Sequence, residues 1–156
     1  MKIKPCLWLS HNVQEAIDFY TSVFKGSRIL STSYYPADFP GFGGEILVAD
    51  LEIEDQQFML LNGGPAFTFN EAVSFFIEAN TQEEIDYYWT NLMADGGSEG
   101  QCGWLKDRFG LSWQVAPAML GHLLQDEDRE RAWRVMQAMM QMRKIMVKDI
   151  EEAAKE

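Results

Sequence analysis

The chain has 156 residues, of which 47% are hydrophobic and 24% charged, a composition typical of one globular domain with a buried core. Its 13 Lys and Arg residues stand against 24 Asp and Glu residues, so the formal net charge is −11. This sign repels nucleic-acid phosphates and anionic membrane surfaces, and we therefore expect neither nucleic acid nor a membrane as a partner.

The cysteines and the first residues indicate the compartment. Cys6 and Cys102 stand far apart and form no CxxC motif, which is typical of free thiols in a reducing environment. The apolar stretch near the start is too short for a secretory signal. We therefore expect a cytoplasmic protein.

The first half of the chain predicts one helix among four strands. Asn12, with Glu15 three residues later, is typical of a capping box at a helix start, and Gly26 ends the helical pattern. Apolar residues recur between them at helical spacing: Ala16, Phe19, Tyr20, Val23 and Phe24. The helix is thus predicted over 12–25. Strands are predicted over 3–9, 28–35, 45–54 and 57–62.

The second half repeats this pattern in a shorter form. Thr81 and Glu84 make the same capping box, and the apolar residues that follow are shifted by 69 positions from those of the first helix. They are Ile85, Tyr88, Trp89, Leu92 and Met93. Strands are predicted over 73–79, 101–106 and 111–115, with at most a short strand near 97–100. A repeat of two supersecondary units explains both halves.

We therefore predict an α+β fold of tandem βαβββ units, at about 1–63 and 72–116. Each unit is expected to be a mixed, mainly antiparallel sheet with its helix on one face. Residues 117–156 are predicted to form a helical C-terminal extension.

The extension is expected to contain two helices. Pro117 suits the first position of a short helix that ends near Leu124, and the acidic residues 126–128 cap a longer helix. The apolar residues on one side of the longer helix are Ala132, Val135, Met136, Met139, Met140 and Met146. This side packs either on its own domain or on a partner chain, and Met side chains adapt to both.

Several blocks of the sequence resemble a known superfamily. The run HNVQEAIDFYTSVFKG after the first strand is similar to the vicinal-oxygen-chelate superfamily, which includes glyoxalase I, extradiol dioxygenases and bleomycin-resistance proteins. The blocks KPCLWLSHNVQEAIDFYTSVF, FMLLNGGPAF, GWLKDRFGLSWQVAP and RAWRVMQAMMQMRKI resemble its PhnB-like family, some of whose members are labelled 3-demethylubiquinone-9 3-methyltransferase. The resemblance implies two units that curl into an incomplete barrel around a cavity.

In metal-dependent relatives, the resemblance implies one ligand on the first and last strands of each half. The corresponding residues here are Pro5, Ser74, one of Phe58, Met59 and Leu60, and Gln114. A catalytic divalent cation takes about three His or carboxylate ligands, which these residues do not supply. His11 and His122 have no metal-binding spacing and are interpreted as solvated or cap-side residues. We expect neither a metal nor another cofactor.

Strand alternation gives a set of residues expected to face the cavity. They are Leu7, Leu9, Asp50, Ser74, Phe76, Gly103 and Gln114. A mostly apolar lining with a few polar groups is typical of a small-molecule site. The aromatic, glycine-rich stretch 34–44 either covers the cavity mouth or is a surface connection.

Two functions stay open at this point. The first is metal-independent binding of a small, aromatic or oxygenated molecule in the cavity. The second is a glyoxalase- or dioxygenase-like, or methyltransferase-labelled, enzyme in which Ser74, Gln114 or Asp50 would serve hydrogen bonding or general acid/base chemistry. Open sheet edges and the apolar side of the extension further predict a homodimer.

Overall fold

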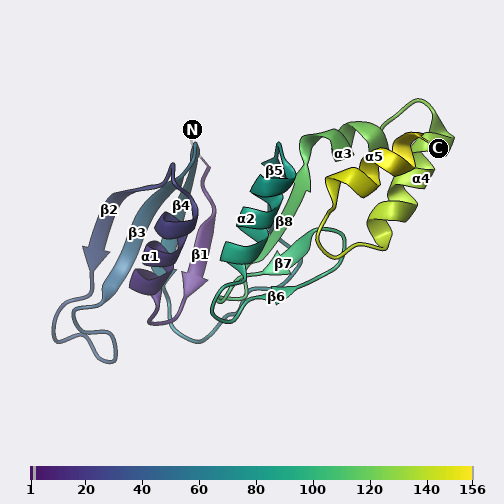
Figure 1. The fold of residues 1–156 in the computed structure, drawn as a ribbon. Helices are drawn as coiled ribbons and strands as arrows, with labels where there is room; N and C mark the ends of the chain where they lie inside the picture. Colours follow the sequence, from purple (N-terminus) through teal and green to yellow (C-terminus); the bar gives the residue numbers. More distant parts are fainter. Residues whose placement is uncertain (2, 156) are drawn as a thin grey trace. The chain divides into compact units, whose positions relative to one another are not determined.

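The computed structural model describes residues 1 and 3–155. The chain divides into two compact units, Met1–Phe69 and Asn70–Glu156. Each unit has a four-stranded sheet with a helix on one face, and three further helices follow in the second unit (Figure 1). The predicted α+β fold of two βαβββ units with C-terminal helices is confirmed, and neither sheet closes into a barrel.

The first unit contains β1 (Cys6–Leu9), α1 (Val13–Val23), β2 (Arg28–Tyr34), β3 (Ile46–Ile53) and β4 (Gln56–Asn62). The strand order is β1-β4-β3-β2, in which β1 runs parallel to β4 and the other pairs are antiparallel. Parallel pairing of the first and last strands needs a long connection between them, and α1 with the β2-β3 pair supplies it.

Alternate strand residues of this unit face α1 and form its core. Leu7 and Leu9 lie opposite Leu60 and Asn62 of β4, and all four side chains are buried. The prediction that Leu7 and Leu9 face the cavity is therefore wrong. Burial of each leucine contributes about 1.5–3 kcal/mol, so the helix-covered face is where these side chains stabilise the fold.

The second unit contains β5 (Ser74–Ala79), α2 (Gln82–Leu92), β6 (Ser98–Glu99), β7 (Trp104–Lys106) and β8 (Ser112–Pro117). The strand order β5-β8-β7-β6 and the parallel first and last strands reproduce the topology of the first unit. The side chains packed under α2 include Leu105, Trp113 and Val115. The internal repeat is thus a repeat of structure.

The repeat interval differs between helices and strands. Leu9 and Ala79 are the last residues of β1 and β5, which places them 70 positions apart, whereas the helix caps Asn12 and Thr81 are 69 apart. The first unit therefore has one more residue in its strand-to-helix corner. His11 lies in that corner and has a φ of 63°. This left-handed conformation accommodates the added residue.

The hairpin of β7 and β8 also differs from the prediction by one residue. Trp104 lies opposite Gln114 and Leu105 opposite Trp113. From the sequence alone, a four-residue turn over 107–110 between the predicted strands pairs Trp104 with Trp113 instead. The connection is a three-residue loop closed by the Asp107 N–H on the Leu111 carbonyl at 3.0 Å, with a φ of 83° at the glycine before Leu111. Loop length fixes which residues of a hairpin pair, so a three-residue loop with a left-handed glycine gives another register than a four-residue turn.

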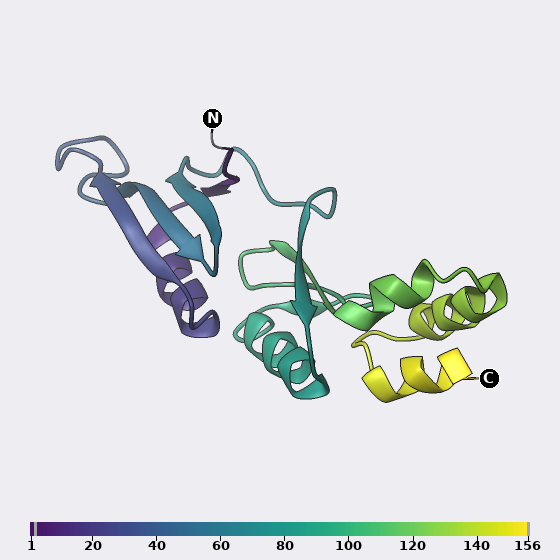
Figure 2. The same ribbon diagram turned by 90° about the horizontal axis from the view of Figure 1, so that it is seen from above.

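The C-terminal extension has three helices, α3 (Ala118–Leu124), α4 (Arg129–Met140) and α5 (Val147–Lys155), where two were expected. Figure 2 shows them grouped at one end of the second sheet. Val135, Ile145 and Ile150 are fully buried in a cluster that joins the three helices to the end of β8. Ala132 and Val135 on the apolar side of the extension therefore pack on their own chain, whereas Met140 and Met146 are exposed.

Two details of the extension also differ from expectation. Pro117 is the N-cap of α3 rather than its first helical residue. Met146 lies outside α4, because the chain leaves the helix at Gln141. None of the helices in the described part of the chain is long and apolar enough to cross a membrane.

Candidate functional site

The face of the second sheet opposite α2 carries polar and aromatic side chains. Gln114 Nε2 donates a hydrogen bond of 2.8 Å to Ser74 Oγ, which joins β8 to β5 on this face. Phe76, opposite Gln114 in the register, is 57% exposed. Three of the residues expected at the site, Ser74, Phe76 and Gln114, thus lie together. Strand alternation accounts for their common face, and that they line a ligand site stays a prediction.

A pocket of about 260 Å³ opens on the same sheet. Its lining residues are Glu71, Ser98, Glu99, Gly100, Trp104, Leu105, Lys106 and Ser112. The side chain of Ser112 is buried, and its hydroxyl has no hydrogen-bond partner among the residues that the structure describes. An unsatisfied buried hydroxyl costs about 1–3 kcal/mol, which a ligand that bonds to it would recover.

Two ion pairs border this pocket. Lys106 Nζ pairs with Glu71 Oε1, and Arg143 Nη1 pairs with Glu99 Oε1. The hydrogen bond from Lys106 lowers the pKa of the Glu71 carboxyl below its ordinary value, so Glu71 is ionised at neutral pH. Sequence reasoning missed Glu71 because it lies before β5 in a segment without periodicity, and it missed Ser112 as an isolated hydroxyl.

Asp50 lies on the open face of the first sheet, in the row of Met59 and Cys6. Lys4 Nζ forms an ion pair with Asp50 Oδ1, and Ser31 Oγ donates to Oδ2 at 3.2 Å. Asp50 is therefore a paired carboxylate. Burial raises the pKa of the neighbouring Cys6 thiol above its ordinary value, and the positive charge of Lys4 offsets part of this rise. The raised pKa keeps Cys6 protonated.

Gly103 is not a cavity residue. Its φ of 83° places it in a turn, and a Cβ at this position would lie 2.7 Å from the carbonyl oxygen of Val115 and 3.1 Å from a side-chain carbon of Ile145. Its N–H donates to the carbonyl of Arg143 at 2.7 Å. The C-terminal extension occupies the space beside Gly103. The prediction that Gly103 faces the cavity is therefore wrong.

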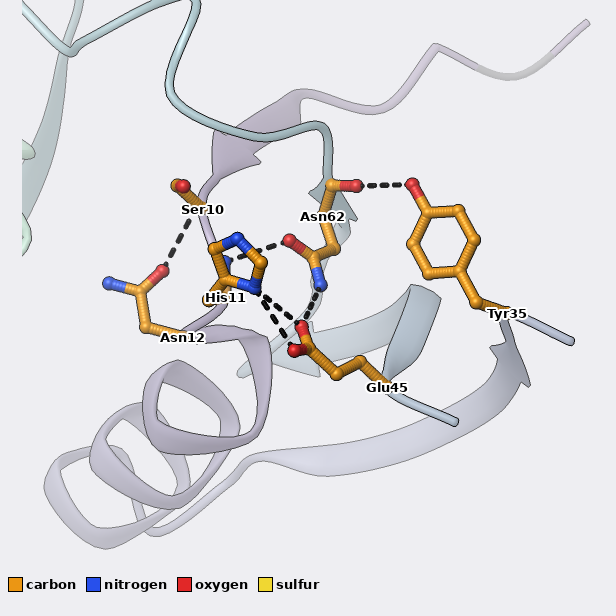
Figure 3. Close-up of polar contacts among 6 residues, drawn as sticks. All are labelled: Ser10, His11, Asn12, Tyr35, Glu45 and Asn62. Carbon is orange, nitrogen blue, oxygen red and sulfur yellow. Dashed lines mark hydrogen bonds and ion pairs between the residues drawn. The ribbon is translucent and has the colours of Figure 1, made fainter. Parts of the chain in front are cut away.

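A second polar cluster lies at the strand-to-helix corner of the first unit (Figure 3). His11 Nδ1 is 3.0 Å from each oxygen of Glu45. Asn62 Nδ2 donates to Glu45 Oε2 at 2.8 Å, and the His11 N–H donates to Asn62 Oδ1 at 2.8 Å. Because an ionised carboxylate only accepts, Nδ1 of His11 carries the proton in this arrangement. His11 is exposed and directly precedes the N-cap Asn12, as its interpretation as a solvated or cap-side residue predicts, and it has fixed polar partners in addition.

The aromatic stretch after β2 packs on this cluster. The ring of Phe42 stacks on His11 with centroids 4.5 Å apart and an interplanar angle of 3°. Tyr35 stacks on Phe42 in turn. The hydroxyl of Tyr35 donates to the carbonyl of Asn62 at 2.7 Å (Figure 3). A pocket of about 230 Å³ opens beside His11 and Glu45. The aromatic stretch therefore has a packing role within its own unit.

Comparison with known proteins identifies the family. Residues 1–116 match the model of the family described as 3-demethylubiquinone-9 3-methyltransferase. The chain belongs to this family. The resemblance of the sequence blocks to the PhnB-like family is thus confirmed. No curated protein matches the chain significantly.

Solved structures agree with this assignment. A putative 3-demethylubiquinone-9 3-methyltransferase, the PhnB protein from Bacillus cereus, is 34% identical with a TM-score of 0.69, over 76% of this chain and 100% of that one. A protein from Pseudomonas aeruginosa is 23% identical with a TM-score of 0.60, over 75% and 97%. The fosfomycin resistance protein FosX from Listeria monocytogenes, in complex with Mn(II) and sulfate, is 14% identical with a TM-score of 0.55, over 76% and 92%. The last two share the fold.

Residues of this PhnB-like chain do not fit the metal site of metal-dependent relatives. The 70-residue strand interval places Lys4, rather than Pro5, in the position equivalent to Ser74. Met59 and Gln114 occupy equivalent places on β4 and β8. An ammonium, a thioether, a hydroxyl and an amide supply no negative charge for a divalent cation. Across residues 1 and 3–155, no group of three or more His, Cys, Asp or Glu side chains could hold a metal ion.

Proposed function

We propose that this PhnB-like protein binds a small, aromatic or oxygenated molecule on the open face of its second sheet, without a metal ion. The observation that carries the proposal is the buried, unpartnered hydroxyl of Ser112 in the wall of a pocket of about 260 Å³. Buried polar groups in folded proteins almost always have a partner, and a donor group of a ligand in this pocket would supply one for Ser112.

Neighbouring side chains support the same function. The hydrogen bond between Gln114 and Ser74 fixes two polar groups on this face, and Phe76 beside them exposes an aromatic ring to the ligand side. A few placed polar groups among apolar ones are the usual composition of a small-molecule site. Lys4, Met59, Ser74 and Gln114, at the positions of the metal ligands in metal-dependent relatives, supply no negative charge. We therefore expect this binding to need no metal ion.

A ligand screen by native mass spectrometry tests the proposal on the full chain and on Ser112→Ala. We expect a small molecule bound at one equivalent, with affinity reduced roughly tenfold in Ser112→Ala, as expected for a lost buried hydrogen bond. Without ligand, Ser112→Ala should be as stable as the parent or more stable, because it removes an unsatisfied group. Equal ligand binding by both chains would contradict the proposal, and so would stoichiometric Zn, Ni, Mn or Fe in elemental analysis.

A further inference from the structure

The lining of the Ser112 pocket also indicates the class of ligand, an inference that rests on the function proposed above. Most of its polar side chains are hydrogen-bond acceptors in part or in full: the carboxylates of Glu71 and Glu99 and the hydroxyls of Ser98 and Ser112. Lys106 is the one cationic side chain in the lining, and it is already paired with Glu71. We propose that the pocket takes a small organic cation, an ammonium group on an aromatic or apolar body.

Both carboxylates can accept a bond from a ligand while keeping their present partners. The ion pairs with Lys106 and Arg143 engage Oε1 of Glu71 and Oε1 of Glu99. A carboxylate offers about four acceptor positions, so acceptor capacity is left at each glutamate. The side chains of Glu71 and Glu99 are 63% and 44% exposed. Such exposed ion pairs contribute little stability and rearrange readily when a ligand enters.

Trp104 supplies the aromatic wall of the pocket. It lies on the open face of β7, opposite Gln114, and is partly exposed. The indole face is the most favourable aromatic surface for a cation. An ammonium group can therefore be held by the charge of Glu71 and Glu99 and by the face of Trp104, while Ser112 Oγ accepts one of its N–H bonds.

An anionic ligand meets the opposite conditions in this pocket. Two carboxylates repel it, and the net charge of −11 on the chain lowers the concentration of anions near its surface. Lys106 in the lining and Arg143 at its border would have to leave Glu71 and Glu99 to bind it. The volume of about 260 Å³ lies just below the usual range for drug-sized ligands. The cation is therefore a small one.

Three probes of one shape but different charge test this inference on the unaltered full chain. 2-Phenylethylamine, 2-phenylethanol and 3-phenylpropionate are titrated at pH 7 in low salt, with the amide signal of Ser112 and the indole N–H signal of Trp104 followed by NMR. We expect the amine to shift both signals and to bind about fivefold more tightly than the alcohol. The carboxylate should bind most weakly, and added salt should weaken the amine alone.

The outcomes separate this inference from the proposed function. If the alcohol or the carboxylate binds as tightly as the amine, the pocket binds small molecules but the cation inference is wrong. If no probe shifts either signal, both proposals are wrong at this pocket. Glu99→Gln should lower amine affinity severalfold and leave alcohol affinity unchanged. The matched control Glu127→Gln, at an exposed acid between α3 and α4, should change neither, and equal effects of the two variants would overturn the inference.

Discussion

The indole nitrogen of Trp113 donates a hydrogen bond of 2.9 Å to Oδ2 of Asp107, a residue that is only 2% exposed. The other oxygen accepts from the backbone N–H groups of Phe109 and Leu111 at 2.9 and 3.1 Å. One carboxylate thus closes the β7-β8 loop and orients a core tryptophan. Buried carboxylates persist where several donors compensate for the loss of solvent, and these three donors do so here.

Asp107→Ala should lower the free energy of unfolding by about 3 kcal/mol, because three buried donors lose a charged acceptor together. Urea unfolding followed by tryptophan fluorescence measures this. The control is Asp95→Asn, which removes the charge from the exposed ion pair with Arg108, keeps a residue type tolerated at the φ of 58° found there and should change stability by less than about 1 kcal/mol. Similar losses in the two variants would show that Asp107 does not organise the loop.

The pH dependence of the first unit should involve Glu45. The hydrogen bond from His11, followed by that from Asn62, lowers the pKa of the Glu45 carboxyl below its ordinary value of 4.5. A lowered pKa in the folded state adds stability that is present above the ordinary value and is lost as the pH falls through the folded value. NMR titration of the Glu45 carboxyl should show the lowered midpoint, and His11→Ala should raise it.

A stability comparison checks the same linkage. Between pH 6 and pH 3 the parent chain should lose more stability than Glu45→Gln, because the variant has no carboxyl to protonate at this position. Glu127→Gln serves as the control and should follow the parent curve. An unchanged pH profile in Glu45→Gln would mean that the cluster around His11 contributes nothing to this dependence.

Gly103 and Gly41 allow backbone strain to be separated from steric overlap. Both have a φ above 80°, but a Cβ at Gly103 meets the carbonyl of Val115 whereas nothing lies within 4 Å of a Cβ at Gly41. Gly41→Ala should therefore cost about 1 kcal/mol for the conformation alone. Gly103→Ala should cost roughly 3 kcal/mol, since the backbone cannot yield without disturbing the extension. Thermal unfolding of both variants measures the difference, and equal costs would contradict the close approach.

The element order of this protein could be predicted from local signals. Thr81 caps α2 by accepting a hydrogen bond from the Glu84 N–H, as the capping box predicted. Alternation likewise placed Phe76 and Gln114 on the open face of the second sheet. These features depend on residues close in sequence, and the folded strands keep the alternation seen in the sequence.

The errors came from residues whose conformation leaves no periodic signal. His11, in a left-handed conformation, adds one residue to the first corner, and a one-residue slip exchanges the two faces of a strand. Leu7 and Leu9 were placed on the wrong face for this reason. The loop after Asp107 displaced the register of β7 in the same way. Glu71 and Ser112 join one pocket only through the tertiary fold, which sequence spacing does not reveal.

The last prediction concerns assembly, which we expect to be a homodimer. The expected reason was an uncovered apolar side of the extension, but Val135, Ile145 and Ile150 are buried within their own unit. The remaining reason is the edge strand β2, all seven residues of which are exposed, with Ile29 50% exposed. An unpaired edge of this kind is covered most simply by the same edge of a second copy.

Light scattering at micromolar concentration should therefore give twice the monomer mass of 17.9 kDa. Ile29→Lys should return the mass to that of the monomer, because a lysine on an edge strand disfavours pairing between edges. Trp133→Lys is the matched control: Trp133 is an exposed apolar residue on α4, and this variant should stay dimeric if β2 forms the contact. Dissociation by Trp133→Lys alone would move the interface to the extension, and a parent mass of 17.9 kDa would show that the chain is a monomer with its β2 edge open to solvent.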